Sequence, residues 1–228
     1  MTPMRPFPRS VEHELLDGHL IDPVELGRNL GEMAFLNRLP GGVGSSVAAV
    51  RRLLASGEGR PVLDIGTGAG DFAHRLRRAT PVPIVLADVS HEVLEIARRN
   101  VEGMDDVSLI LADVRELPLP DGSAAVAHSS LVLHHLDPQG VVAALLEMAR
   151  VAVAGIVVND LRRSRLALAM TAAPILALAR SPVTRHDGIL SARRAYTLDE
   201  LDDLAAQAGL RPIARTASWW PRVTTTYR

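Results

Sequence analysis

The 228-residue chain is long enough for one α/β domain with a small appendage, since 47% of its residues are hydrophobic. Its formal net charge is −1 with both signs interspersed, so neither a nucleic-acid groove nor an anionic membrane surface is indicated as a partner. The chain has no cysteine, which excludes disulfides, thiolate nucleophiles and zinc–sulfur sites. All 25 basic residues are arginine, which excludes a Schiff-base lysine and a Walker-type phosphate-binding lysine.

No stretch is typical of a targeting or membrane segment. Residues 1–17 mix proline, arginine and glutamate without the apolar core of a secretory signal. The longest apolar run, residues 166–179, contains Pro174 and is too short to cross a bilayer comfortably. These features predict a soluble cytoplasmic protein, either a monomer or a homodimer.

The first part of the chain, residues 1–55, is expected to form a helical cap in front of the main fold. Residues 1–9 are proline-rich and expected to be loosely attached. Apolar residues recur at helical spacing through residues 11–39, where Asp22-Pro23 supplies a cap and a first-turn signal. The pattern leaves open whether this cap only covers the sheet or forms a lid over a substrate.

The most informative stretch is a glycine-rich turn. Residues 62–65 form a short apolar run typical of a buried strand, and residues 71–78 have the pattern of a helix. Three alternate glycines, Gly66, Gly68 and Gly70, fall between them. Glycine permits positive φ and lets a ligand approach the main chain, and the free N–H groups of the helix face the same gap. An ordinary turn without a ligand remains the alternative.

A carboxylate at the tip of the strand narrows the choice of ligand. The dinucleotide pattern G-x-G-x-x-G places a pyrophosphate on the helix N-terminus. Here the glycines alternate, and Asp64 stands two residues before the first of them. A carboxylate at this position repels phosphate and suits an ammonium group.

Strands and helices alternate after this turn, which predicts a parallel sheet with crossover helices. The further predicted strands are residues 83–87, 107–111, 124–128, 151–158, 211–217 and 222–227. The other predicted helices are residues 45–54, 91–100, 141–150, 166–179 and 197–207.

The turn resembles the first motif of the class I S-adenosylmethionine-dependent methyltransferases; its sequence is Asp64-Ile65-Gly66-Thr67-Gly68-Ala69-Gly70. This resemblance implies an α/β fold with a Rossmann-like, seven-stranded, mostly parallel sheet, a C-terminal antiparallel hairpin and a helical N-terminal cap. The methyltransferase domain would span residues 56–228, with an insertion near residues 161–196. The cofactor would be S-adenosyl-L-methionine, released as S-adenosyl-L-homocysteine, with no metal.

The resemblance also assigns cofactor-binding residues. The loop would wrap the amino-acid end of the cofactor, and Asp88 would accept hydrogen bonds from the ribose hydroxyls, although it could merely begin a helix. Asp113 would meet the adenine amino group, with a solvated loop aspartate as the rival interpretation. The full set is Asp64, Ile65, Gly66, Thr67, Gly68, Gly70, Asp88, Val89, Asp113, Val114 and Ser129; of these, Val89 and Val114 would pack on the adenine ring.

Two adjacent histidines follow the fourth predicted strand of the sheet, where the family brings substrate and cofactor together. His134 or His135 is a candidate general base, because imidazole titrates near neutrality. A turn-capping role is the alternative. A metal site is disfavoured, because adjacent residues on a turn rarely direct both nitrogens at one ion. His186, beside Asp187, is a further candidate base.

Four polar residues are candidate substrate ligands. Asn159 and Asp160 follow the predicted fifth strand at the same rim, and Arg162 and Arg194 are candidates to attract an acidic acceptor. Each is equally compatible with an exposed position. Residues 181–196 are expected to form a polar loop over the active site.

Taken together, these features predict a methyltransferase that acts at oxygen on a small aromatic or polyketide-like acceptor. A C-methyltransferase acting on a quinone-like ring is the alternative, and a non-catalytic cofactor-binding relative is a third possibility. Nucleic acid and membrane are not expected partners.

Overall fold

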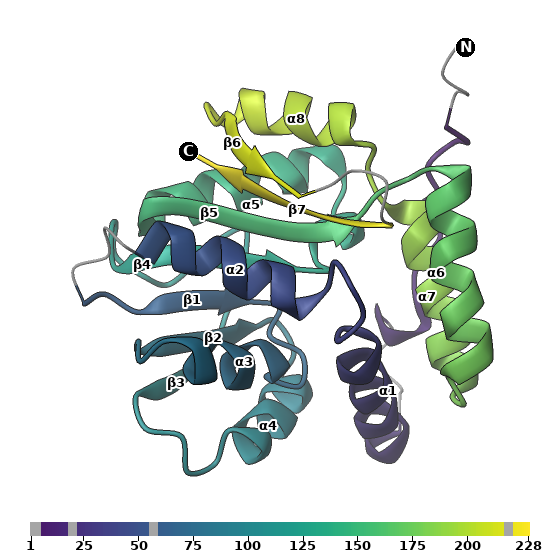
Figure 1. The fold of residues 1–228 in the computed structure, drawn as a ribbon, viewed down its shortest axis with the longest axis horizontal. Helices are drawn as coiled ribbons and strands as arrows, with labels where there is room; N and C mark the ends of the chain where they lie inside the picture. Colours follow the sequence, from purple (N-terminus) through teal and green to yellow (C-terminus); the bar gives the residue numbers. More distant parts are fainter. Residues whose placement is uncertain (1–5, 18–21, 55–58, 217–220) are drawn as a thin grey trace.

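The computed structural model describes residues 6–17, 22–54, 59–216 and 221–228, and the predicted junction at Trp219 and Trp220 lies outside them. The strands are β1 Val62–Ile65, β2 Ile84–Asp88, β3 Val107–Leu111, β4 Ala124–Ser130, β5 Ala152–Leu161, β6 Pro212–Arg215 and β7 Arg222–Tyr227. They form a seven-stranded sheet in the order β3-β2-β1-β4-β5-β7-β6 (Figure 1). Because β7 is antiparallel to both β5 and β6 while the other pairs are parallel, the predicted sheet and C-terminal hairpin are confirmed.

Helices cover both faces of the sheet. Those described are α1 Pro23–Leu36, α2 Val43–Leu54, α3 Asp71–Ala79, α4 His91–Asn100, α5 Pro138–Val151, α6 Arg165–Leu178, α7 Pro182–Arg194 and α8 Leu198–Gln207, with short 3-10 turns η1 Leu15–Asp17 and η2 Leu133–His135. Side chains of α2, α3 and α4 build the apolar core on one face, and those of α5 and α8 build the core on the other. All four residues of β1 are buried, as expected for a central parallel strand covered on both sides.

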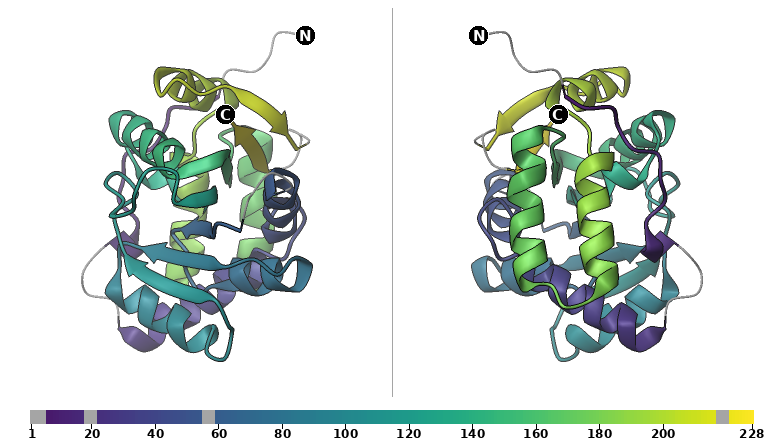
Figure 2. Two further views of the ribbon diagram at one scale, coloured as in Figure 1. Left: turned by 90° about the vertical axis from the view of Figure 1, so that its left-hand side faces the viewer. Right: turned by 90° about the vertical axis from the view of Figure 1, so that its right-hand side faces the viewer.

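The sheet order creates a crevice at the end of β1. β1 pairs with β2 on one side and with β4 on the other. From β1 the chain continues to β2 and β3 on one side and then returns to form β4 and β5 on the other. Ligands of open α/β sheets bind at such switch points, outside the carboxyl ends of the strands. In Figure 1, α1, α6 and α7 lie beyond these strand ends, and Figure 2 shows α6 and α7 side by side.

The prediction of a polar loop over residues 181–196 is wrong, because α7 occupies most of it. Ser181 accepts a hydrogen bond from the Thr184 N–H and Pro182 fills the first turn, which is a standard helix start. The helix buries small and polar residues such as Thr184 and Ser191, so it lacks the apolar stripe by which a helix is recognised.

The expected loose attachment of residues 1–9 is wrong for the described part of this segment. The Arg9 guanidinium donates to the carbonyl oxygens of His134 at 2.9 Å and Leu136 at 2.8 Å, and to that of Arg194. It also lies 4.3 Å from the centre of the Tyr196 ring. The start of the chain is therefore fastened over η2 and the end of α7.

The fifth strand is longer than predicted. β5 continues to Leu161, so Asn159 and Asp160 lie within the strand and pair with Thr224 and Val223 of β7. The antiparallel partner explains the extension, because β7 supplies hydrogen bonds beyond the end of β4.

Within the described ranges, no helix has the length and apolar content needed to cross a bilayer.

Candidate functional site

The glycine turn adopts the backbone that its sequence predicts. Gly66, Gly68 and Gly70 have φ of +66°, +53° and +78°, a region that residues with a Cβ rarely adopt. A Cβ on Gly66 would lie 2.2 Å from Val132 Cγ2, whereas one on Gly68 would meet nothing closer than Leu30 Cδ2 at 3.9 Å. The turn is therefore packed against protein at Gly66 and open at Gly68.

Asp64 is held by the protein on both carboxylate oxygens. One accepts a hydrogen bond from His128 Nδ1 at 2.7 Å and the other from Thr67 Oγ1 at 2.8 Å. Asp64 is only 2% exposed. The His128 ring is stacked on the Phe72 ring, with the two ring centres 3.9 Å apart. Asp64 also borders the cavity described below, so its negative charge faces the turn from a fixed position.

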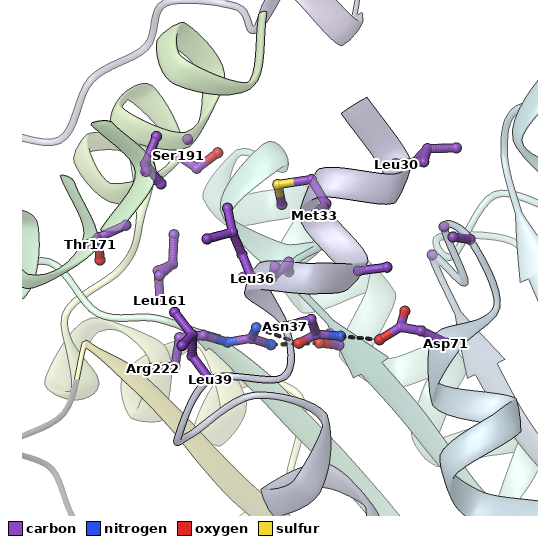
Figure 3. A pocket seen from close by; sticks show the side chains of 18 of the residues that line it. Leu30, Met33, Leu36, Asn37, Leu39, Asp71, Leu161, Thr171, Ser191 and Arg222 are labelled. Carbon is purple, nitrogen blue, oxygen red and sulfur yellow. Dashed lines mark hydrogen bonds between the residues drawn. The ribbon is translucent and has the colours of Figure 1, made fainter. Parts of the chain in front are cut away.

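A cavity of about 510 Å³ extends from the glycine turn to η2 beneath α1, α6 and α7. Figure 3 shows Leu30, Met33 and Leu36 around this space. Its apolar lining is formed by Leu16, Leu30, Met33, Leu36, Leu39, Leu161, Met170, Pro174 and Ile175. Its volume lies in the range of small-molecule sites, and its lining suits a mostly apolar ligand.

A chain of hydrogen bonds among residues that line the cavity connects three elements around it (Figure 3). Arg222 Nη1 donates to Asn37 Oδ1 at 2.5 Å, and Asn37 Nδ2 donates to Asp71 Oδ2 at 2.6 Å. Burial raises the pKa of Asp71, and it lowers the pKa of Arg222 to about 10, so the guanidinium stays charged at neutral pH. Asn37 thereby ties the end of α1 to the start of α3 and to β7.

Polar contacts also join α1 to α7. Glu32 accepts hydrogen bonds from the backbone N–H groups of Arg180 and Ser181, at the start of α7. Asn29 donates to Thr184 Oγ1 at 3.0 Å and is the buried residue of α1. Carboxylates at a helix N-terminus are electrostatically favoured, so these contacts hold α1 over the cavity as a cover.

A polar patch interrupts the apolar lining. We call it the histidine wall, formed by Glu14, His134 and His135. His134 Nε2 lies 3.7 Å from Glu14 Oε1, and His135 Nε2 lies 3.7 Å from Glu14 Oε2. The two imidazole rings are 4.4 Å apart and tilted by 33°, and all three residues line the cavity. Adjacent residues on a turn were expected to direct both nitrogens at one point only rarely, yet both rings here face one carboxylate.

His134 is fixed from behind by Asp160. The Asp160 carboxylate accepts from His134 Nδ1 at 2.7 Å and from the His134 backbone N–H at 3.3 Å. Burial alone would raise the pKa of Asp160, but His134, the Leu161 N–H and Arg222 together lower it below its usual value. An ionised carboxylate only accepts, so Nδ1 carries the proton and Nε2 is directed at Glu14.

The structure brings one predicted ribose ligand next to the turn. Asp88 Oδ2 accepts from the Gly68 N–H at 3.3 Å and Oδ1 from the Ser90 N–H at 3.1 Å. Burial raises the pKa of Asp88 above its ordinary value. Ser129 is buried, its hydroxyl has no hydrogen-bond partner among the described residues, and it pairs with Ile65 across the sheet.

The three residues predicted to contact adenine have different surroundings. Val89 is 70% exposed beside Asp88, whereas Val114 is buried in the core under α5. Asp113 accepts hydrogen bonds from the Arg115 side chain, which holds its pKa below the usual range. These three assignments stay predictions.

The predicted substrate residues are bonded mostly to protein. Asn159 is fully buried and donates to the Gly41 and Gly42 carbonyls, and Asp160 positions His134. Arg194 Nη2 donates to the His135 carbonyl at 2.8 Å. None of the three lines the cavity within the described residues, nor does Arg162, whose backbone N–H donates to Pro221.

The predicted base His186 is half-exposed on α7 and is not among the described residues that line the cavity. Its Nδ1 bonds the carboxylate of its neighbour Asp187 at 2.8 Å. Asp187 also accepts from the backbone N–H groups of Leu15 and Leu16, so it anchors η1.

Several functional candidates that the sequence analysis missed are single polar residues on different elements. Asn29 Oδ1 and Thr171 Oγ1 are buried at the cavity and have no hydrogen-bond partner in the described part of the chain. Glu14, Asn37 and Arg222 belong to the same group. No local motif marks them, since they meet only through tertiary packing.

The site fits the cofactor implied by the resemblance. The positive-φ turn leaves space at Gly68, the Asp64 carboxylate faces this end of the cavity, and the buried Ser129 hydroxyl is unsatisfied. Asp88 lies one strand away, on the same rim. These groups match a ligand with a cationic amino-acid end and a sugar.

Residues 62–155 match the family model of the methyltransferase domain. The ubiquinone/menaquinone biosynthesis C-methyltransferase UbiE of Citrifermentans bemidjiense is 34% identical over 108 residues, which covers 45% of this chain and 45% of that protein. The chain spans less than half the length of the curated relatives it matches.

Solved structures agree on the fold. Human N-acetylserotonin methyltransferase in complex with S-adenosylmethionine matches with a TM-score of 0.68 at 17% identity, over 91% of this chain and 56% of that one. The O-methyltransferase NcsB1 from neocarzinostatin biosynthesis, in complex with S-adenosyl-L-homocysteine and 1,4-dihydroxy-2-naphthoic acid, matches with a TM-score of 0.65 at 23% identity, over 90% and 58%.

Proposed function

We propose that this chain, a member of the class I S-adenosylmethionine-dependent methyltransferases, transfers a methyl group to an oxygen of a small aromatic or polyketide-like acceptor. The observation that carries the proposal is the single cavity that joins the glycine turn to the histidine wall. A methyl donor held at the turn and an acceptor held under α1, α6 and α7 would share that space.

The chain's own residues would bind the cofactor by charge and by close backbone approach. When bound, S-adenosylmethionine supplies an electrophilic methyl group on a sulfonium sulfur. The Asp64 carboxylate, fixed by His128 and Thr67, attracts the cationic amino-acid end. Gly68 admits the ligand to the main chain, and Asp88 accepts from the ribose hydroxyls.

The cavity lining would select and orient the acceptor. Leucine and methionine side chains of α1 and α6 exclude water and favour an apolar ring. The unsatisfied Asn29 Oδ1 and Thr171 Oγ1 are placed to take hydrogen bonds from acceptor hydroxyls or water. Alignment of this kind contributes roughly 7–11 kcal/mol to lowering the barrier of an intermolecular reaction.

We assign removal of the acceptor proton to the histidine wall. The acceptor hydroxyl must lose its proton as the oxygen attacks the methyl carbon, and this wall is the basic, polar part of the lining. Asp160 keeps His134 in the tautomer whose Nε2 faces Glu14. His135 is partly exposed and lies on the same surface.

C-methylation of a quinone-like ring is the second candidate. The identity to the UbiE C-methyltransferase over 108 residues favours it. A dihydroxynaphthalene-type ring fits either reaction, because it offers both oxygen and ring carbon.

The test is a transfer assay with S-adenosylmethionine carrying a labelled methyl group. Purified protein is offered dihydroxynaphthoates, simple phenols and quinols, and the product linkage is determined by mass spectrometry and NMR. A methoxy product supports the proposal, and a ring-methyl product transfers support to the second candidate. Calorimetry with S-adenosylhomocysteine accompanies the assay. Binding without turnover on any acceptor would favour a non-catalytic relative, and a folded protein that does not bind would overturn the cofactor assignment.

A further inference from the structure

We propose that the histidine wall is a binding site for one divalent transition-metal ion, with Zn²⁺ as the reference ion. Its ligands would be His134 Nε2, His135 Nε2 and a carboxylate oxygen of Glu14. These atoms lie within 4.8 Å of one another in the described part of the chain. Two histidines and one glutamate form a donor set of known catalytic zinc sites that keep an open fourth position.

The separations suit an ion after a small adjustment. Zinc lies roughly 2.0–2.2 Å from nitrogen and oxygen ligands, so tetrahedral ligand atoms are about 3.3 Å apart. His134 Nε2 is 3.7 Å from Glu14 Oε1 and His135 Nε2 is 3.7 Å from Glu14 Oε2, a few tenths of an ångström wider than the bound geometry, and the three ligand atoms all lie within 4.8 Å of one another. An ion between these atoms would draw the two nitrogens and one Glu14 oxygen closer together.

The second observation is the support behind the ligands. His134 presents Nε2 because Asp160 accepts its Nδ1 proton at 2.7 Å, an arrangement typical of metal-bound histidines. Ser191 Oγ donates to Glu14 Oε1 at 2.8 Å, which fixes the carboxylate. Glu14 and His134 are both nearly fully buried, so this is a pre-formed site rather than a surface cluster.

The local charges are compatible with a divalent cation. Glu14 and Asp160 are two carboxylates near the ion position. Arg194 Nη1 lies 3.9 Å from Glu14 Oε1 and opposes them, on the side where Ser191 also bonds. The ion is therefore expected between Glu14 Oε2 and the two imidazoles.

The role of the ion in catalysis rests on the proposed function, whereas the binding site rests on geometry alone. All three ligands line the cavity, so the open position faces the acceptor. With the ion bound, the wall would promote proton loss through the metal and not through a free imidazole: an acceptor hydroxyl at the open position would lose its proton to water near neutral pH, because a zinc-bound oxygen acid is strongly acidified. The new O–CH₃ bond then forms as the S–CH₃ bond breaks and its electron pair stays on sulfur. The metal site therefore predicts a preference for acceptors with a hydroxyl that can reach the histidine wall.

The test uses full-length protein freed of metal with a chelator and then titrated with ZnCl₂ by calorimetry. We expect one Zn²⁺ per chain, with affinity lowered at least 100-fold in His135→Ala and in Glu14→Gln, and 10–100-fold in Asp160→Asn. His74→Ala is the matched control and should bind normally, because His74 lies on α3, bonds the Asn100 carbonyl of α4 and is outside the described cavity lining. Co²⁺ substitution should give visible absorption bands that His135→Ala removes.

S-adenosylhomocysteine binding is measured on the same samples to verify folding and to separate the two hypotheses. Zinc binding that is absent, or unchanged by His135→Ala and Glu14→Gln in folded protein, overturns the metal site and leaves the methyltransferase proposal intact. Zinc binding without cofactor binding leaves the metal site and overturns the proposed function.

Discussion

The substitution Gly66→Ala tests the packing of the glycine turn. A residue with a Cβ at φ near +66° costs about 1–2 kcal/mol in the left-handed region. The new Cβ would also stand 2.2 Å from Val132 Cγ2, and overpacking of this kind typically costs about 1–3 kcal/mol. The free energy of unfolding should therefore fall by about 2–5 kcal/mol, which lowers Tm by roughly 4–20 °C at about 2–4 °C per kcal/mol for a domain of this size.

Gly103→Ala separates the two contributions. Gly103 has φ of +79° and open space where its Cβ would lie, so only the backbone cost of about 1–2 kcal/mol applies. Thermal and urea unfolding of both variants give the difference, and Gly66→Ala combined with Val132→Ala should recover the steric part. If Gly66→Ala is no less stable than Gly103→Ala, the close packing against Val132 is refuted.

Four further outcomes are expected. Gly68→Ala should resemble Gly103→Ala in stability but lower S-adenosylhomocysteine affinity at least tenfold by calorimetry, because its Cβ enters the cavity. Cofactor affinity should fall as pH decreases toward the raised pKa of Asp88, because protonation removes a hydrogen-bond acceptor for the ribose. Asp88→Asn should bind the cofactor more weakly and lose this pH dependence. Asp160→Asn should lower kcat by up to about 10²-fold while cofactor Kd stays constant; unchanged kcat would argue against the role given to His134. Thr171→Val should change the free energy of unfolding by less than about 1 kcal/mol, since its buried hydroxyl has no described partner, but raise KM for the acceptor.

The fold was predictable because its local signals agree with one another. The Asp22 and Ser90 caps, the capping box of Thr197 and Glu200, and the buried run of β1 all form as their sequences indicate. α7 was missed because its buried face is polar, facing α1 and η1 rather than the apolar core. The length of β5 was missed because its last residues pair only with β7, a partner distant in sequence.

The glycine turn was easier to predict than the opposite end of the cavity. The turn is a contiguous motif whose glycines are required by its backbone geometry. The other end of the cavity is assembled from η1, α1, η2, α6 and α7, which lie far apart in the sequence. Glu14 and His134 are 120 positions apart in the sequence, so only tertiary structure shows that they face each other.

The polar attachment of α1 has a consequence for turnover. Asn29 is the one residue of α1 described as buried, and the helix is held to α7 by hydrogen bonds that water can replace. Undocking it would leave both sheet cores intact, because no residue of α1 belongs to either of them. Amide protons of α1 should exchange with solvent far sooner than those of β1 and β4, and a molecule held in the cavity would have an exit that requires no global unfolding.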